Sequence, residues 1–290
     1  MPVLYSYTAM IPSLPPSTGP IGVFDSGYGG LTILDKIRGL MPEYDYIYLG
    51  DSARCPYGPR SFEVVYEFTL QAVSKLFELG CPLVILACNT ASAKALRTIQ
   101  QINLPAIDAT RRVLGVIRPT AECIGEITRS RHVGILATAG TIKSESYLLE
   151  IHKLSPDIVV TGEACPMWVS LVENNEYQSE GADYFVKQHI NRLLDKDPMI
   201  DTIILGCTHY PLLLDKIRQF TPGHIRIIAQ GEYVARSLQD YLNRHPEMDA
   251  RCEKGGKCRF LTTESENKFE ESASIFLGRQ DIKVESIALE

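Results

Sequence analysis

The chain has 290 residues, with 29 Lys and Arg against 35 Asp and Glu and a formal net charge of −6. This length predicts about two domains and is enough to bury a core without disulfides or a structural metal. The hydrophobic content of 45% is that of a globular protein, and the negative charge argues against a nucleic-acid partner.

Residues 1–19 contain four prolines and no clear period, so we predict an N-terminal extension outside the core. After them, short apolar runs alternate with stretches of helical period. The runs predict strands at 20–25, 45–50, 82–87, 132–137, 157–161, 202–206 and 225–229. Helices are predicted from Ser61 to Gly80, around Val186 to Leu194 and around Val234 to Leu242. This alternation predicts an α/β protein with mainly parallel sheets.

The sequence also contains an internal repeat. Residues 21–26 are similar to 133–138, and residues 83–90 are similar to 202–209. We therefore predict two similar, pseudo-symmetric α/β domains that face each other across a central cleft. The first domain would comprise 20–112 plus 230–290, and the second 113–229.

In both copies of the second repeated string, a cysteine lies at the carboxyl end of a predicted strand, where open α/β sheets bind ligands. Cys88 follows the first of these strands and Cys207 the second. The sequence therefore predicts one cleft with a thiol on each wall.

The eight cysteines could form four disulfides by count alone. However, the first positively charged side chain is Lys36, so a secretory signal is not predicted, and the apolar runs are too short to span a membrane. We expect a cytoplasmic protein with reduced thiols that serve in packing, metal binding or acid–base chemistry.

A cysteine between a strand and a helix lies near the helix N-terminus, where its pKa should fall and anions should bind. Either cysteine alone could equally be a small buried residue. Together, two thiols on matching walls suit removal of a proton from one face of a carbon and its return to the other. Asp25 could assist one thiol and His209 the other, unless they form an Asx turn and a helix cap.

The glycines after Asp25 match neither the Rossmann nor the P-loop spacing, so we expect no nucleotide and no cofactor. The segment from Cys252 to Cys258 lacks the spacing of a zinc knuckle. We expect a hairpin turn there and no metal. Cys55, outside the matched pair, is interpreted as a packing or loop residue.

Four strings in order, GVFDSGYGGLTIL, YLGDSARCPYG, ACNTASA and LGCTHYPLL, resemble those of the glutamate racemases, within the aspartate/glutamate racemase superfamily. The resemblance runs from about residue 20 to 270. It implies a cofactor-independent isomerase that interconverts L- and D-glutamate and supplies D-glutamate for peptidoglycan, and it suggests a homodimer.

The resemblance also implies residue roles. Cys88 and Cys207 become the acid–base thiols, with Asp25 assisting the first, and His209 and Glu173 the second. Glu173 would otherwise be read as a solvated helix carboxylate. The residues implied for substrate binding are Asp25, Ser26, Tyr57, Gly58, Asn89, Thr90, Thr138, Thr141, Thr208 and His209, with less specific matches at Asp51 and Pro56.

Three other readings remain open. A racemase of the same superfamily could act on another amino acid such as aspartate. A thiol hydrolase could use Cys207 as nucleophile and His209 as base, although acyl transfer does not need a second thiol. A binding protein without catalytic activity could retain the cleft.

Overall fold

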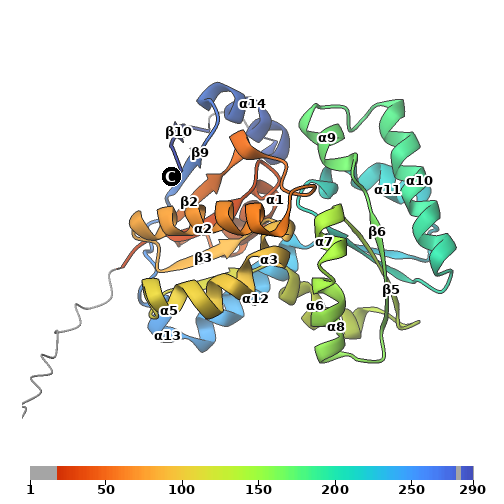
Figure 1. The fold of residues 1–290 in the computed structure, drawn as a ribbon, viewed down its shortest axis with the longest axis horizontal. Helices are drawn as coiled ribbons and strands as arrows, with labels where there is room; N and C mark the ends of the chain where they lie inside the picture. Colours follow the sequence, from red (N-terminus) through yellow and green to blue (C-terminus); the bar gives the residue numbers. More distant parts are fainter. Residues whose placement is uncertain (1–17, 279–281, 290) are drawn as a thin grey trace, which may run out of the picture.

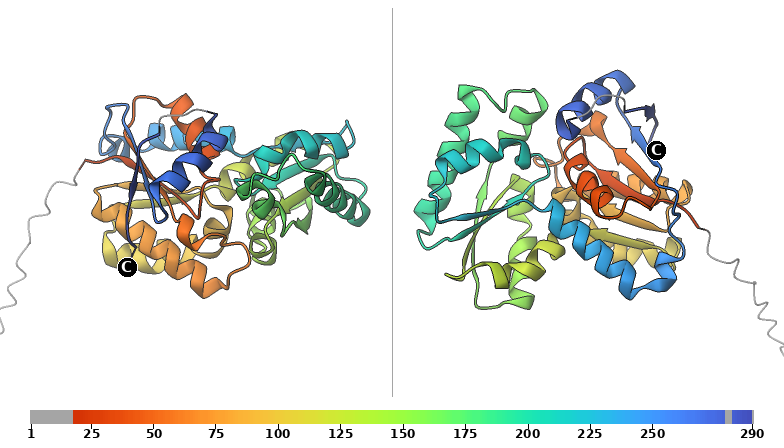
Figure 2. Two further views of the ribbon diagram at one scale, coloured as in Figure 1. Left: turned by 90° about the horizontal axis from the view of Figure 1, so that it is seen from above. Right: turned by 180° about the vertical axis from the view of Figure 1, so that it is seen from behind.

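The computed structural model describes residues 18–278 and 282–289. Within these residues the strands form two sheets, and every pairing between neighbouring strands is parallel. Each sheet with its helices forms one lobe, and the two lobes lie side by side (Figures 1 and 2). This arrangement confirms the predicted α/β class.

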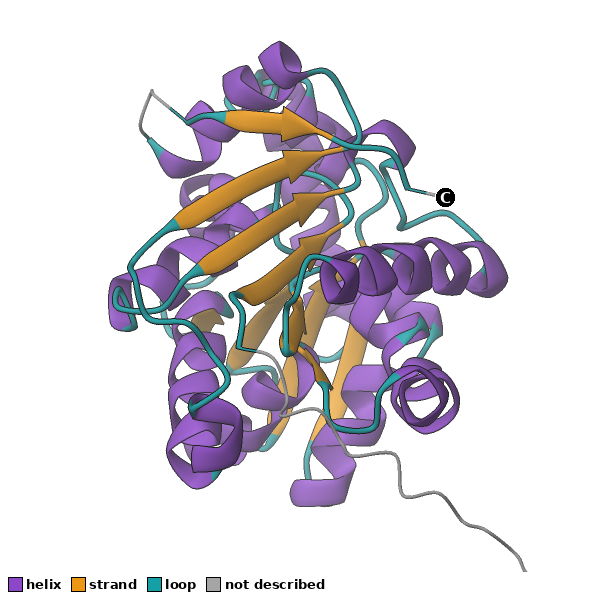
Figure 3. Cartoon of the chain, turned by 90° about the vertical axis from the view of Figure 1, so that its left-hand side faces the viewer, coloured by secondary structure: helices purple, strands orange, loops and turns teal. Residues whose placement is uncertain are grey.

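The larger sheet has six strands in the order β10-β9-β2-β1-β3-β4. Helices cover both of its faces (Figure 3). Its strands are β1 (Ile21–Asp25), β2 (Tyr46–Gly50), β3 (Leu83–Leu86), β4 (Arg112–Gly115), β9 (Cys258–Thr262) and β10 (Val284–Ser286). The helices of this lobe are α1 (Leu31–Leu40), α2 (Phe62–Glu78), α3 (Asn89–Lys94), α4 (Leu96–Thr98), α5 (Leu104–Ile107), α12 (Gly231–Arg244), α13 (Pro246–Asp249) and α14 (Glu266–Leu277), with the short turns η1 (Ser52–Arg54) and η2 (Ile99–Asn103).

The smaller sheet has four strands in the order β6-β5-β7-β8. They are β5 (His132–Ala137), β6 (Val159–Ala164), β7 (Thr202–Gly206) and β8 (Arg226–Ile228). The surrounding helices are α6 (Ile117–Ile127), α7 (Ala139–Lys143), α8 (Ser146–Leu154), α9 (Trp168–Glu173), α10 (Glu180–Lys196) and α11 (Leu214–Phe220), with the 3₁₀ turn η3 (Tyr210–Leu213).

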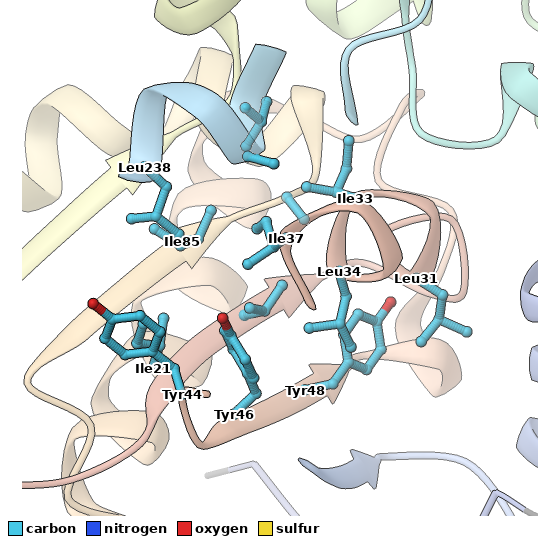
Figure 4. Packing of buried hydrophobic residues seen from close by; sticks show 14 of the residues in the cluster. Ile21, Leu31, Ile33, Leu34, Ile37, Tyr44, Tyr46, Tyr48, Ile85 and Leu238 are labelled. Carbon is cyan, nitrogen blue, oxygen red and sulfur yellow. The ribbon is translucent and has the colours of Figure 1, made fainter. Parts of the chain in front are cut away.

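Alternation along the strands explains why both faces of the larger sheet are buried. Val23 points into a cluster with α1 and α12, whereas Phe24 points into a second cluster with α2. Figure 4 shows the first cluster, in which Leu238 of α12 lies beside Ile85 of β3. Strands buried in this way have their backbone and both faces fixed, so only their ends are open to a ligand.

A buried polar network joins the two connections between the lobes. Gln230, between β8 and α12, donates from Nε2 to the Tyr147 hydroxyl at 2.6 Å and to the Val116 carbonyl at 3.1 Å. Its Oε1 accepts from Asn89 Nδ2 at 2.8 Å, and the Tyr147 hydroxyl donates to Asn89 Oδ1 at 2.6 Å. Val116 lies on the segment that leads from the six-stranded lobe to the four-stranded lobe, and Gln230 lies on the segment that leads back. The Gln230 amide therefore joins the two connections.

The seven predicted strands are present with ends shifted by up to three residues. The sequence analysis missed β4, β9 and β10. The predicted boundary at 112 falls at the start of β4, and the predicted return at 230 falls at Gln230. The hairpin predicted from Cys252 to Cys258 is wrong, because the chain there enters β9, which pairs with β2 in parallel.

The predicted extension, residues 1–19, falls outside the described residues except for its last two. Gly19 forms a bridge to Cys252 and is buried, so this end of the segment belongs to the fold rather than outside the core. All three predicted helices are present. The helix that begins after Ser61 has Ser61 as its N-cap, where the side chain accepts from the Val64 N–H.

Replacing Gln230 with leucine should lower the free energy of unfolding by about 2 kcal/mol, because the buried Asn89 amide and Tyr147 hydroxyl lose a partner. Urea denaturation would measure the change. The matched control is Gln188→Leu, because among the described residues this amide bonds only the exposed Tyr184 hydroxyl, at 3.3 Å. This substitution should change stability by less than about 0.5 kcal/mol. Equal effects of the two substitutions would contradict this role for Gln230.

Candidate active site

A cavity lies where the carboxyl ends of the two sheets meet. Both lobes line it. The six-stranded lobe contributes Ser26, Cys55, Pro56, Tyr57, Gly58, Cys88, Asn89 and Thr90, and the four-stranded lobe contributes Thr138, Val169, Cys207, Thr208 and His209. The predicted cleft with a thiol on each wall is therefore present in the structure.

Cys88 lies two residues after the end of β3 and is the N-cap of the short helix α3. Its sulfur accepts from the Ala91 N–H at 3.4 Å, and its thiol donates to the Ser26 hydroxyl at 3.4 Å. Burial, reinforced by the nearby Asp25 carboxylate, raises the pKa of Cys88 to about 12. The resting side chain is thus a neutral thiol, ready to donate a proton.

The predicted fall in the pKa of this thiol is wrong. The helix terminus does supply a hydrogen bond, but α3 has only six residues and the thiol is almost completely buried. Loss of hydration outweighs that single N–H contact. Cys207 is not at an α-helix terminus at all, since the turn η3 begins three residues later at Tyr210.

Cys207 begins a chain of three polar groups. Its sulfur is 3.8 Å from Nδ1 of His209, and Nε2 of the same ring is 3.0 Å from Oε1 of Glu173. Burial disfavours the imidazolium, yet contacts with Cys207 and Glu173 outweigh it and raise the pKa of His209 well above its usual value. Burial likewise disfavours the Glu173 carboxylate, but its hydrogen bond from His209 keeps its pKa lowered.

Asp25 ends β1 and is fully buried beside the first thiol. Its carboxylate accepts from the Gly27 N–H at 3.0 Å and from the Thr208 hydroxyl at 3.5 Å. Burial raises the pKa of Asp25, and the positive His209 opposes that shift. The carboxylate therefore forms part of the buried wall between the lobes, behind the residues that line the cavity.

Glycines permit close approach of the two lobes at two points. A Cβ atom on Gly29 would lie 2.5 Å from Nδ1 of His209, and one on Gly58 would lie 2.9 Å from Cβ of Thr138. Both distances are shorter than side chains tolerate. The glycine-rich loop after β1 and the loop after β2 can therefore contact the opposite lobe only without side chains at these positions.

Asp51 positions the loop after β2 and does not line the cavity. Its carboxylate accepts a short hydrogen bond from the buried Tyr57 hydroxyl, forms an ion pair with Arg54 at 2.7 Å, and accepts from the Thr263 hydroxyl at 2.8 Å. Burial and the neighbouring Asp51 raise the pKa of Tyr57, which stays a neutral phenol.

Three hydroxyl groups from the two lobes meet across the cavity. Thr90 lies 2.9 Å from Thr138 and 3.3 Å from Thr141, and the latter two are 3.1 Å apart. Thr141 thus joins the predicted polar group without lining the cavity itself. Because hydroxyls can donate or accept, this triangle can reorient toward a carboxylate that enters the cavity.

Two lining residues were missed by the sequence analysis. Val169 of α9 supplies an apolar wall, and Cys55 lies in the loop after β2, where its thiol donates to Oε1 of Glu173 at 3.0 Å. Cys55 lies between Asp51 and Pro56, two positions that the family resemblance implied. This neighbourhood was the one sign in the sequence that Cys55 could line the site.

Among the residues that the structure describes, no group of three or more His, Cys, Asp or Glu side chains is arranged to hold a metal ion. None of the helices within residues 18–278 and 282–289 could span a lipid bilayer.

The chain resembles known racemases over most of its length. The family model described as Asp/Glu/Hydantoin racemase matches residues 32–238. A glutamate racemase from a Ruegeria species is 38% identical over 270 residues, which cover 90% of this chain and 97% of the relative. A glutamate racemase from Bacillus cereus is 39% identical over 271 residues, covering 93% and 97%.

Solved structures show the same fold. A glutamate racemase isoform from Bacillus anthracis superposes with a TM-score of 0.84 at 36% identity, covering 93% of this chain and 98% of that one. A glutamate racemase from Francisella tularensis, solved in complex with D-glutamate, gives a TM-score of 0.83 at 32% identity and covers 96% and 99%.

Alkylation of Cys88 should report its raised pKa. Because only the thiolate reacts, modification by iodoacetamide in the folded protein should be slow at pH 8 and rise about tenfold per pH unit up to pH 10. Mass spectrometry of the peptide that carries Cys88 measures the rate. The same peptide in the denatured chain is the control, and its rate should level off above its pKa of about 8.5. A rate in the folded protein that levels off below pH 9 would contradict the raised pKa.

Proposed function

Since the chain belongs to the Asp/Glu/hydantoin racemase family, and within it to the glutamate racemases, we propose that it interconverts L- and D-glutamate through Cys88 and Cys207. The observation that carries the mechanism is the pair of thiols on one cavity, each following an inner strand of its own sheet. The product D-glutamate would supply peptidoglycan synthesis.

The reaction requires one thiolate and one thiol on opposite faces of the α-carbon. The thiolate takes the α-proton, so that a C–H bond breaks and an S–H bond forms, and the electron pair remains on the carbon and its carboxylate. The opposite thiol then gives its proton to the other face of that carbon. The two cysteines end with exchanged protonation states, and reaction of the other enantiomer restores them.

The neighbours of Cys207 can move its proton. His209 lies 3.8 Å from the sulfur and can take the thiol proton or return it, while Glu173 orients the ring through the bond at 3.0 Å. On the other wall, the buried Asp25 carboxylate acts electrostatically on Cys88 and would assist this thiol. The ammonium group of the substrate would offset the cost of a thiolate on this side.

Polar groups around the thiols suit an amino acid with two carboxylates. Ser26, Asn89 and Thr208 line the cavity next to the sulfur atoms. The hydroxyls of Thr90, Thr138 and Thr141 can turn from one another toward a carboxylate, and Tyr57 and Gly58 close the same end. Asp51 acts indirectly by holding Tyr57, and Pro56 lines the cavity beside it.

The relay of Cys207, His209 and Glu173 alone would also suit a thiol hydrolase. The second thiol on the same cavity supports a racemase instead, because acyl transfer requires an oxyanion hole opposite the nucleophile rather than a buried proton donor. A preference for glutamate over aspartate is supported by the relatives and is tested directly below.

The purified protein should exchange the α-proton of L-glutamate with heavy water and bring its optical rotation to zero. Cys88→Ser and Cys207→Ser should each reduce this racemisation at least about a thousandfold, since a serine hydroxyl is a far weaker acid than a thiol. Proton NMR and polarimetry measure the two processes.

The control is Cys123→Ser, which alters a half-exposed thiol on α6 away from the cavity and should leave turnover unchanged. Wild-type turnover in either active-site variant would refute the two-thiol mechanism. Equal turnover of aspartate would refute the specificity, and absence of both exchange and racemisation in the folded protein would refute the enzyme assignment.

The assembly and location of the protein are further parts of this proposal. We infer a cytoplasmic homodimer, which the resemblance to the glutamate racemases suggests. Light scattering at micromolar concentration should give about twice the chain mass of 32.3 kDa. A mass equal to one chain at the same concentration would contradict the dimer.

A further inference from the structure

A third thiol reaches the relay behind Cys207. The thiol of Cys55 donates to Oε1 of Glu173 at 3.0 Å, and this same oxygen is 3.0 Å from Nε2 of His209. Among the described residues, these two contacts are the hydrogen bonds of the Glu173 carboxylate. The geometry is therefore a chain from Cys55 through Glu173 and His209 to Cys207.

This series of hydrogen-bonded side chains crosses from one lobe to the other. Cys55 belongs to the loop that follows β2 in the six-stranded lobe, whereas Glu173 ends the helix α9 in the four-stranded lobe. The cavity lies beside this crossing, with Cys55 in its wall. If Cys55 is removed, His209 is the one hydrogen-bonding partner of Glu173 that remains among the described residues, and it is the group that this carboxylate is proposed to orient.

Packing holds the thiol against the carboxylate. A Cβ atom on Gly27 would lie 2.9 Å from the sulfur of Cys55 and 3.2 Å from Oε1 of Glu173, so the glycine backbone closes directly over the bond. Burial and the adjacent Glu173 raise the pKa of Cys55 well above its usual value. The side chain therefore remains an S–H donor rather than a competing anion.

We propose that Cys55 is a positioning residue, whose thiol fixes the Glu173 carboxylate against His209 and so completes the proton relay to Cys207. This inference rests on the proposed function. Its consequence is one-sided, because only proton transfer at Cys207 depends on the relay, and Cys88 has different neighbours.

Three substitutions separate the hydrogen bond from packing. Cys55→Ser keeps a donor of similar size, Cys55→Val fills the site without a donor, and Cys55→Ala removes both donor and volume. The alanine and valine variants should lose about fivefold in kcat with KM unchanged within about twofold, and the serine variant should retain at least about half of wild-type kcat.

Isotope effects test the one-sided consequence. Each variant is assayed with L- and D-glutamate carrying deuterium at the α-carbon. In the alanine and valine variants the primary isotope effect should rise for one enantiomer, the one whose α-proton Cys207 removes, and should not rise for the other. A general loss of structure would change both enantiomers alike.

The proton NMR signal of His209 Nε2–H supplies a readout that does not depend on turnover. It should broaden through exchange with water in the alanine and valine variants and persist in the serine variant. If wild-type protein does not racemise glutamate, the proposed function fails, yet this signal still tests the hydrogen-bond chain.

Four results would overturn the role of Cys55. One is a valine variant with wild-type kcat, which would assign the effect to packing. The second is a serine variant as impaired as alanine, and the third is an equal change of isotope effect for both enantiomers. An unchanged Nε2–H signal in all variants would show that Cys55 does not hold Glu173.

Discussion

The meeting of two parallel sheets at their carboxyl ends is the constraint on which the rest of the site depends. Every described strand pairing is parallel, so within each sheet the loops that follow the strands emerge at the same end, where the strands have their carboxyl termini. These two ends face one another, and the residues that follow β3 and β7 therefore share one cavity. Without that convergence the two cysteines would be unrelated buried thiols.

Each wall carries a thiol beyond the end of an inner strand, but the two thiols differ in their electrostatic surroundings. Cys88 is held by a helix N–H and a hydroxyl beside the buried Asp25, and burial keeps it protonated. Cys207 instead contacts an imidazole whose pKa is raised by its sulfur and carboxylate partners. The proposed proton exchange between the two thiols would therefore start from unequal surroundings.

Much of this arrangement was predictable from the sequence, because buried strands such as Ile21–Asp25 and Thr202–Gly206 are continuous apolar runs and the repeat pairs the cysteines. The strand β9 was missed because Arg259 interrupts its apolar run, and β4 because only one of its four residues is buried. The pKa of Cys88 was predicted wrongly because the sequence indicates the helix terminus but not how deeply the thiol is buried.

The role of Cys55 also lay beyond the sequence. It does not belong to the repeat, and its contact with Glu173 joins residues 118 positions apart on different lobes. Only the packed structure brings the loop after β2 onto the end of α9. By contrast, the family resemblance placed Glu173 near the second thiol, and the distances to His209 give that placement a physical basis.

The central claim is that two thiols address opposite faces of one carbon. A crystal structure of the wild-type protein with bound glutamate tests it most directly. We predict that the α-carbon lies between the sulfurs of Cys88 and Cys207, on opposite faces and about 3.5 Å from each. Both sulfurs on the same face, or an α-carbon within reach of only one of them, would contradict the account.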